Sequence, residues 1–254
     1  SATGETGKRS VTGDAATGGL VGSNNSVQET PGGTNNPIIS KSWADIDVTY
    51  SGSDPGSLDA EKFGGLAGCN QKGTILDSYA RGSVTVDNSG NSWNALNVGG
   101  LAGCILYRGI IERSFSTGAV SGTNVSNIGG LVGNVTSGGN AGVVVDSYWD
   151  EGTSGLTSSA GGTGLTTNEM KVQANFVGFD FTNTWNIDGS TNDGYPFLRA
   201  VSATTYVEWS GSTSESWDVS GNWANSDLPG SSDIAIIPSG LSNYPVISTS
   251  VTSL

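Results

Sequence analysis

One glycine-rich phrase occurs four times in the first 135 residues of the chain, and it restricts the fold more than any other feature. It reads TGGLVGSN at 17–24, FGGLAGCN at 63–70, VGGLAGCI at 98–105 and IGGLVGNV at 128–135. A phosphate-binding loop needs one copy, whereas four copies in order indicate a structural unit used repeatedly. The copies begin 46, 35 and 30 residues apart, so constant phrases alternate with connections of variable length.

A second phrase follows each copy, and it places an aromatic residue directly after a serine. The pairs are Ser42-Trp43, Ser78-Tyr79, Ser114-Phe115 and Ser147-Tyr148. Short β-branched runs lie between clusters of glycine, serine and asparagine, which is typical of strands and turns. A constant core with variable connections predicts an all-β chain folded as a parallel β-helix, or β-solenoid. Its equivalent strands would pair in register about 4.8 Å apart.

The solenoid interpretation gives each repeated residue a structural role. The glycines that open the phrase are expected to supply tight corners with positive φ and close backbone approach; they are Gly18, Gly64, Gly99 and Gly129. The leucines two residues later are expected to form an inward-facing ladder; they are Leu20, Leu66, Leu101 and Leu131. The aromatic residues of the second phrase are expected to form another inward ladder.

Cys69 and Cys104 occupy the same slot in two consecutive copies. In-register strands bring their Cα atoms to roughly disulfide distance, but side chains on such strands run parallel rather than toward each other. We therefore prefer two stacked free thiols, with a disulfide as the alternative in an oxidising compartment.

The phrase GGLVG or GGLAG, followed by Ser-Tyr-Ala-x-Gly-x-Val, resembles the GLUG-motif repeat of bacterial secreted and surface proteins. The resemblance covers roughly residues 1–155, and it implies a segment of a large adhesin-like protein. The first repeat departs from the pattern, because Ile46 stands where Gly82 and Gly118 stand in later copies. The opening SATG resembles the tail of a Ser-Tyr-Ala-x-Gly phrase, so we expect the chain to begin within a repeat of a longer parent.

Three regions are expected: a solenoid over 1–163, its cap over 164–201 and the start of a separate β module over 202–254. The cap segment, with DSYWD before it, resembles the segment that closes such arrays. Thr166 and Glu169 have capping-box spacing, which predicts a short helix through about Gln173. An aromatic cluster is expected to cover the open end of the core; it comprises Phe176, Phe179, Phe181 and Trp185, with 195–198 completing the seal. A ligand-binding aromatic platform is the alternative.

Residues 202–254 differ in character, with Trp209, Trp217 and Trp223 and a strand-like run at 234–237. They resemble the opening of a β module found in secreted proteins of the Bacteroidetes. We expect a small β appendage packed on the end of the solenoid, or the first coils of another β-helix.

The formal net charge is −13, with only 10 basic residues. Nucleic-acid binding requires patches of Lys and Arg, so this composition excludes it as a function class and disfavours docking on anionic lipid. No stretch approaches the ~20 apolar residues of a membrane helix, so no direct membrane insertion is expected. We expect an extracellular or bacterial cell-surface location.

Parallel β-helices also host polysaccharide lyases and hydrolases, so a carbohydrate-active enzyme is one alternative. Such chemistry needs converging carboxylates, or a carboxylate with a basic partner. The acidic candidates are Asp45 with Asp47, Asp146 with Asp150 and Glu151, and Asp180 with Asp188. The chain has no histidine, and Asp77 and Asp146 share a slot with Lys41 and Arg113, which is typical of a solvated outer face with ion pairs between layers. We predict no catalytic residues.

The turn at 186–194 offers oxygen ligands for calcium from Asn186, Asp188 and Asn192. A solvated turn is the alternative, and no other cofactor is expected. The predicted function is a stiff, non-catalytic scaffold for attachment. Its expected partners are neighbouring domains of the parent chain, glycans, host or abiotic surfaces, and secretion machinery. A purely structural spacer of a surface filament or gliding adhesin is the second alternative.

Overall fold

The computed structural model describes residues 10–12, 16–25, 36–51, 61–91, 96–199, 206–226, 228–229 and 234–246. The chain divides into two compact units, Ser1–Leu198 and Arg199–Leu254. Within the described residues the first unit contains short strands and one four-residue α-helix. The second unit is a small β structure with its own core.

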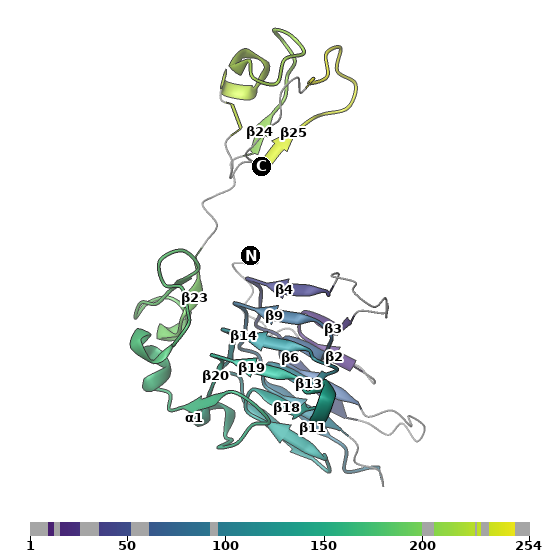
Figure 1. The fold of residues 1–254 in the computed structure, drawn as a ribbon, viewed down its shortest axis with the longest axis vertical. Helices are drawn as coiled ribbons and strands as arrows, with labels where there is room; N and C mark the ends of the chain where they lie inside the picture. The colour runs from purple at the N-terminus through teal and green to yellow at the C-terminus, as the bar shows by residue number, and fades with distance from the viewer. Residues whose placement is uncertain are drawn as a thin grey trace. The chain divides into compact units, whose positions relative to one another are not determined.

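Apart from one antiparallel pair, the described strands of the first unit form five parallel sheets, whose strands Figure 1 shows stacked one above another. Sheet A contains β1 (Ser10–Thr12), β6 (Asp47–Ser51), β11 (Val84–Asp87) and β16 (Val120–Thr123). Sheet B contains β2 (Ala16–Gly18), β7 (Lys62–Gly64), β12 (Asn97–Gly99) and β17 (Asn127–Gly129). Sheet C contains β3 (Val21–Asn25), β8 (Ala67–Gln71), β13 (Ala102–Leu106) and β18 (Val132–Val135).

The two remaining sheets follow the same pattern of one strand from each successive repeat. Sheet D contains β4 (Ile38–Ser40), β9 (Thr74–Leu76), β14 (Ile110–Glu112) and β19 (Val143–Val145). Sheet E contains β5 (Trp43–Ala44), β10 (Tyr79–Ala80), β15 (Phe115–Ser116), β20 (Tyr148–Asp150) and β21 (Thr163–Leu165). The chain therefore visits the sheets in the order B, C, D, E, A and then begins the next layer.

Each such circuit is called a layer: β2–β6 form layer 1, β7–β11 layer 2, β12–β16 layer 3 and β17–β20 layer 4. Strands in neighbouring layers pair in parallel and in register. Val84, for example, lies opposite Val48 in layer 1 and Val120 in layer 3. These stacked parallel sheets are consistent with the predicted all-β parallel β-helix.

The interior of the stack is filled by ladders of apolar side chains. Leu66, Leu101 and Leu131 are fully buried in one core cluster. Leu20 differs from the expected inward ladder, since its residue is 46% exposed. It lies in layer 1, whose strand β2 is at the edge of sheet B, so a described layer covers it from one side only.

The repeated glycines are required by close backbone approach within a layer and between layers, and the expected positive φ is wrong for them. Positive-φ glycines lie elsewhere among the described residues. A methyl group on Gly99 would lie 2.0 Å from the carbonyl oxygen of Ala102 and 2.7 Å from the backbone nitrogen of Gly133. Only glycine leaves room for such contacts. The positive-φ corners are instead at the residue before each repeated serine, with φ of 44–48°; these residues are Lys41, Asp77, Arg113 and Asp146.

The end of the stack beside layer 4 is closed by residues 149–162, before the segment predicted as the cap begins. Trp149 stands in register with the small residue Ser116, and its indole packs against the core. Helix α1 (Glu151–Ser154) is N-capped by Asp150, whose carboxylate accepts a hydrogen bond from the Thr153 N–H at 3.0 Å. The following loop then bonds to layer 4 through Ser159, which accepts from the Leu131 and Val132 N–H groups.

Residues 166–198, which we call the strap, lie along the side of the stack (Figure 1, green). The expected position over the open end of the core is therefore wrong. The capping-box hydrogen bonds form, with Glu169 accepting from the Thr166 N–H at 2.9 Å. The predicted helix does not, because Val172 has extended backbone angles between two 3₁₀ turns. The strap's elements are turns η2 (Glu169–Lys171), η3 (Gln173–Asn175) and η4 (Asn192–Gly194), and antiparallel strands β22 (Trp185–Asn186) and β23 (Phe197–Leu198).

The second unit contains strands β24 (Tyr206–Glu208) and β25 (Ile234–Ile236), which pair in parallel. Its core is formed by Trp209 and Trp223, whose rings meet edge-on with centroids 5.0 Å apart. Asn222 is fully buried, and its amide oxygen accepts from the backbone N–H groups of Thr213 and Ser214. The remaining 3₁₀ turns of the described chain are η1 (Gly138–Asn140), η5 (Ser220–Asn222) and η6 (Ala224–Ser226).

Candidate functional site: an aromatic ladder under a strap

The repeated serines form a ladder of hydrogen bonds that fixes the corner between sheets D and E. The Ser78 hydroxyl donates to the carbonyl of Leu76 at 2.8 Å and accepts from the N–H of Ser42 at 3.2 Å. The same pair of bonds recurs at Ser114 and Ser147 in later layers. A small hydroxyl residue is therefore needed at this position to hold the left-handed residue that precedes it.

This corner directs the next side chain outward, so the aromatic residues lie on the outer face of sheet E. The interior face of the same strands carries small residues instead; Ala44 and Ala80 belong to the core cluster. The expectation of an inward aromatic ladder is therefore wrong. Adjacent residues of a strand face opposite sides, and the narrow interior at sheet E accepts alanine or serine until Trp149 ends the series.

The aromatic rings stack from layer to layer. Tyr79 lies parallel to Phe115 with centroids 4.9 Å apart and parallel to Trp43 with centroids 5.8 Å apart. Tyr79, Phe115 and Tyr148 are at most 6% exposed, whereas Trp43 is 48% exposed. The strap covers the three buried rings and leaves the fourth open.

The strap contributes its own aromatic residues to this covered face. Trp185 is fully buried, with its ring centroid 5.8 Å from that of Phe115 and 4.8 Å from that of Phe179. Phe176 lies edge-on to Tyr148 at 5.2 Å. Burial of this many rings makes the strap a large apolar contact rather than a loosely attached loop.

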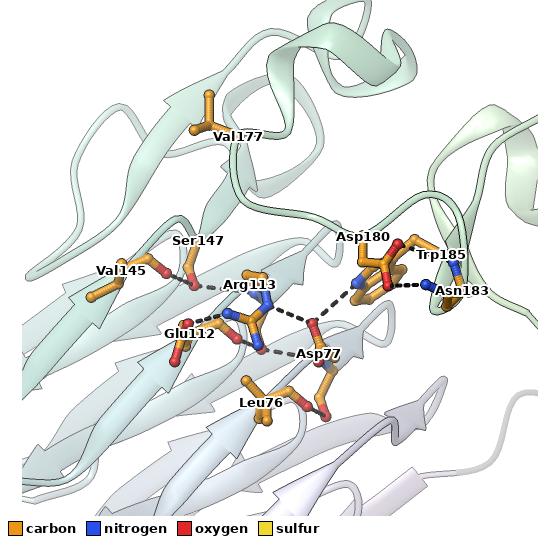
Figure 2. A network of polar contacts seen from close by, with 12 residues as sticks. Leu76, Asp77, Glu112, Arg113, Val145, Ser147, Val177, Asp180, Asn183 and Trp185 are labelled. Carbon is orange, nitrogen blue, oxygen red and sulfur yellow. Dashed lines mark hydrogen bonds and ion pairs between the residues drawn. The ribbon is translucent and has the colours of Figure 1, made fainter.

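A polar network at layers 2 and 3 anchors the middle of the strap, as Figure 2 shows. Asp77 accepts hydrogen bonds from Arg113 Nε at 2.9 Å and from the indole of Trp185 at 3.3 Å. Arg113 also contacts Glu112, and its hydrogen bond with Asp77 raises the pKa of the guanidinium. The Asp77 side chain is 9% exposed, so the expected solvated face is wrong for Asp77, whereas the expected ion pair between layers forms with Arg113.

Two further anchors hold the strap at its ends. Asp150 is fully buried, and its carboxylate accepts from the hydroxyls of Tyr195 at 2.7 Å and Thr167 at 2.8 Å. Burial, together with this hydrogen bond to Asp150, raises the pKa of Tyr195. Arg81 donates to Asn192 at 2.5 Å and pairs with Asp193.

The acidic residues weighed as catalytic candidates have local structural contacts. Asp47 accepts from the N–H and hydroxyl of Ser83, both at 2.8 Å. Asp180 accepts from the N–H groups of Thr182 and Asn183 in a turn. Asp150 holds the strap as described above. These contacts tie Asp47, Asp150 and Asp180 to backbone N–H groups and hydroxyls of the framework.

The calcium candidates also have separate contacts. One oxygen of Asp188 accepts from Ser190 and Thr191, and these bonds lower its pKa. Asn192 bonds Arg81 and the carbonyl of Pro196, and Asn186 pairs with Phe197 between β22 and β23. Calcium binding at this turn stays a prediction. No group of three His, Cys, Asp or Glu side chains suited to a metal occurs among the described residues.

Cys69 and Cys104 are free and buried, and they lie opposite each other in sheet C. Their mutual hydrogen bond and burial raise the pKa of the Cys104 thiol. The pair therefore fills one ladder position of sheet C, as the interpretation of two stacked small residues predicts.

Comparisons with known proteins give two partial relatives. Over 139 residues, 54% of this chain, it is 33% identical to a protein of Evansella cellulosilytica named "Putative Gly-rich membrane protein". Over 98 residues, 37% of this chain, it is 39% identical to Halomucin of Haloquadratum walsbyi. The chain spans 15% and 1% of the lengths of these two relatives. No protein-family model and no solved structure matches it.

Sequence reasoning missed two parts of this site. Trp149, which we call the plug of the layer 4 end, was visible as a bulky residue in a slot otherwise held by Ala or Ser, in register with Ser116. The strap's position along the stack had a weaker signal: the strap carries more aromatic residues than the ladder that it covers. No helix among the described residues is long and apolar enough to cross a membrane.

Proposed function

We propose that the chain is a non-catalytic segment of a large secreted or cell-surface, adhesin-like protein, in which it provides a stiff β-solenoid scaffold for attachment. The observation that carries this proposal is the in-register stack itself. Each layer is joined to the next by backbone pairing in five sheets and by side-chain ladders such as Ser78–Ser114. A unit tied together around its whole circumference resists bending and local opening, as a scaffold requires.

The strap strengthens this interpretation, because it joins layers that are otherwise held only by their neighbours. Asp77 of layer 2, Phe115 of layer 3 and Tyr148 of layer 4 all contact it. Local unfolding of one of these layers would therefore also disturb contacts made by the others. Such coupling raises the free energy of partial opening.

The two relatives support a surface location. One is named "Putative Gly-rich membrane protein" and the other "Halomucin", and this chain matches only a small part of each. We propose the same setting here: an extracellular or bacterial cell-surface position within a longer protein. Neighbouring domains of that protein, glycans, host or abiotic surfaces and secretion machinery are the proposed partners.

Membership of the GLUG-repeat family belongs to the same proposal. It is supported by the four in-register copies of the glycine phrase and by the Ser-aromatic corner that each copy precedes. The second unit, with its tryptophan core, is proposed to begin the separate β module that its sequence resembles.

A polysaccharide panel tests the proposal against the enzyme alternative. The purified chain is incubated with uronic-acid and neutral polysaccharides, and new reducing ends and unsaturated products are measured beside a glycan-binding array. We expect no turnover, with or without binding. Turnover that disappears in Asp47→Asn or Asp150→Asn, while the folded content stays unchanged, would contradict the proposal.

A further inference from the structure

The two ends of the stack differ in how well their side chains are covered. At the layer 4 end, Leu131 is fully buried beneath the loop that carries Ser159. At the layer 1 end, Leu20 is 46% exposed and Trp43 is 48% exposed. Their equivalents in layers 2 and 3 are at most 4% exposed; these are Leu66, Leu101, Tyr79 and Phe115.

The exposed residues are those that a further layer of the same kind would cover. Trp43 stacks on Tyr79 with one ring face and lies in β5, the edge strand of sheet E. Leu20 donates its N–H to the carbonyl of Leu66 on the layer 2 side. In both ladders the next position outward is the one that another repeat would fill with a leucine and an aromatic residue.

Strand β1 shows from which side that layer would come. It pairs in register with β6 of layer 1, so that Val11 lies opposite Val48. Strand β1 therefore occupies a position one layer before layer 1. Only residues 13–15 separate it from β2. The chain thus enters layer 1 from the sheet A position of a preceding layer, whose B, C, D and E positions have no described strand.

We propose that this open end is an interaction surface for one further layer of the same repeat, contributed in cis from the N-terminal side, with β1 as its fifth strand. The inference rests on the proposed scaffold function and adds a direction to it: the stack extends at the layer 1 end, while the layer 4 end is covered by residues 149–162 and by β21. A second copy of the chain is a poorer occupant. A second copy has its own β1 at the same position beyond layer 1. If the layer 1 ends of two copies met, their two β1 strands would therefore lie against each other.

A designed fusion tests the proposal. Residues 62–80, which carry β7–β10, replace residues 1–7, so that Ala80 runs into native residues 8–12 with the spacing found before Val84 in layer 2. Native residues 8 and 9 take the places that Arg81 and Gly82 have after Ala80 in layer 2. They are kept because layer 1 has Ile46 in the slot of Gly82 and Gly118, so the residue that precedes Ile46 in this slot should be the native one. A methyl group on Gly82 would lie 2.0 Å from the carbonyl oxygen of Ile46, so a side chain in that slot points at the preceding layer.

Hydrogen exchange of the β2–β5 amides is the readout, with the original chain as reference. We expect exchange at these amides to slow by about tenfold or more, and the Trp43 indole to become less accessible to a soluble quencher. The matched control carries one extra glycine after residue 9. A shift of one residue turns every side chain to the opposite face, so the control should gain no protection.

Unchanged protection in the in-register fusion would overturn the proposal. So would concentration-dependent protection of β2–β5 in the original chain, because that result would make a second copy the occupant. A second fusion built from residues 97–116 guards against misfolding of the first, and failure of both to protect layer 1 also overturns the proposal. Glycan turnover would remove the scaffold function without altering protection at this end, so the two failures are distinguishable.

Discussion

The leucine ladder and the aromatic ladder arise from equally regular repeats, yet one faces into the stack and the other faces out of it. Leu66, Leu101 and Leu131 point into the stack and are covered by the layers themselves. Tyr79, Phe115 and Tyr148 point out of it and are covered by the strap. Repetition therefore identifies residues that stack, while burial on the inside or the outside is decided by the residues beside them.

The two ladders also share one weakness, which is their layer 1 member. Leu20 and Trp43 have the same neighbours along the chain as their equivalents but lack a covering layer or strap. Each ladder thus contains its own control, in which a leucine or an aromatic residue sits in the same backbone position with less burial.

The largest expected effect is the loss of one covered ring. Phe115→Ala removes a fully buried side chain that contacts Tyr79, Phe176 and Trp185. The free energy of unfolding of this variant should be lower than that of the original chain by about 3–5 kcal/mol, the usual range for a buried Phe→Ala change. Trp43→Ala should cost less than half as much. Chemical denaturation followed by circular dichroism measures both, and equal losses would mean that the strap adds little to the ladder.

The interior ladder should show a similar contrast at slightly smaller size. Leu101→Ala leaves a cavity between two covered layers and should lower the free energy of unfolding by about 2–5 kcal/mol. Leu20→Ala removes a half-exposed side chain and should lower it by less than about 1 kcal/mol. The same denaturation experiment applies. A large effect at Leu20 would show that the layer 1 end is already covered.

The strap's polar anchor should matter less than the rings that it positions. Asp150→Ala leaves the hydroxyls of Tyr195 and Thr167 and the N–H of Thr153 without their acceptor. A loss of about 1–3 kcal/mol is expected for buried donors left unsatisfied. Asp188→Ala, in an exposed turn, is the control and should have a smaller effect. If Asp150→Ala leaves hydrogen exchange across 166–198 unchanged, the anchor has been misassigned.

The smallest effect is a pH dependence carried by the aromatic ladder. Burial raises the pKa of Tyr79 to about 12, so the folded chain holds this proton more tightly than the unfolded chain does. The corresponding stability is fully present below about pH 10, the ordinary tyrosine pKa, and is lost as pH rises toward 12. Urea midpoints across this window should fall less steeply in Tyr79→Phe than in the original chain. Identical slopes would place the Tyr79 hydroxyl in water.

Much of the stack was accessible from the sequence, because in-register pairing needs only repeated phrases at comparable spacing. The phrases at 63–70 and 98–105 do lie opposite each other, with Cys69 beside Cys104. The facing of the aromatic ladder was not predicted correctly, although the strand period of two contained it. Ala44 and Ala80 follow Trp43 and Tyr79 directly, and only one of two neighbours in a strand can face inward.

The strap and the end plug were harder to derive, for different physical reasons. An aromatic cluster such as Phe176, Phe179 and Trp185 announces burial but not the surface that receives it, since the hydrophobic effect has no direction. The partner surface became identifiable only when the outer ladder was known. Predicting the plug would have rested on a single residue, Trp149. One departure from a repeat is weak evidence until the position of its layer in the stack is known.

Electron paramagnetic resonance on two spin labels tests the layering most directly. Thr49 and Ser121 are both register partners of Thr85 in sheet A, one layer to either side. With labels at Thr49→Cys and Ser121→Cys in a Cys69→Ala, Cys104→Ala background, the backbone separation should be about 10 Å, two strand spacings. Strong dipolar broadening, greater still for labels at Thr49 and Thr85, is the predicted result. Spectra of both doubly labelled chains equal to the sum of the single-label spectra would contradict the stack.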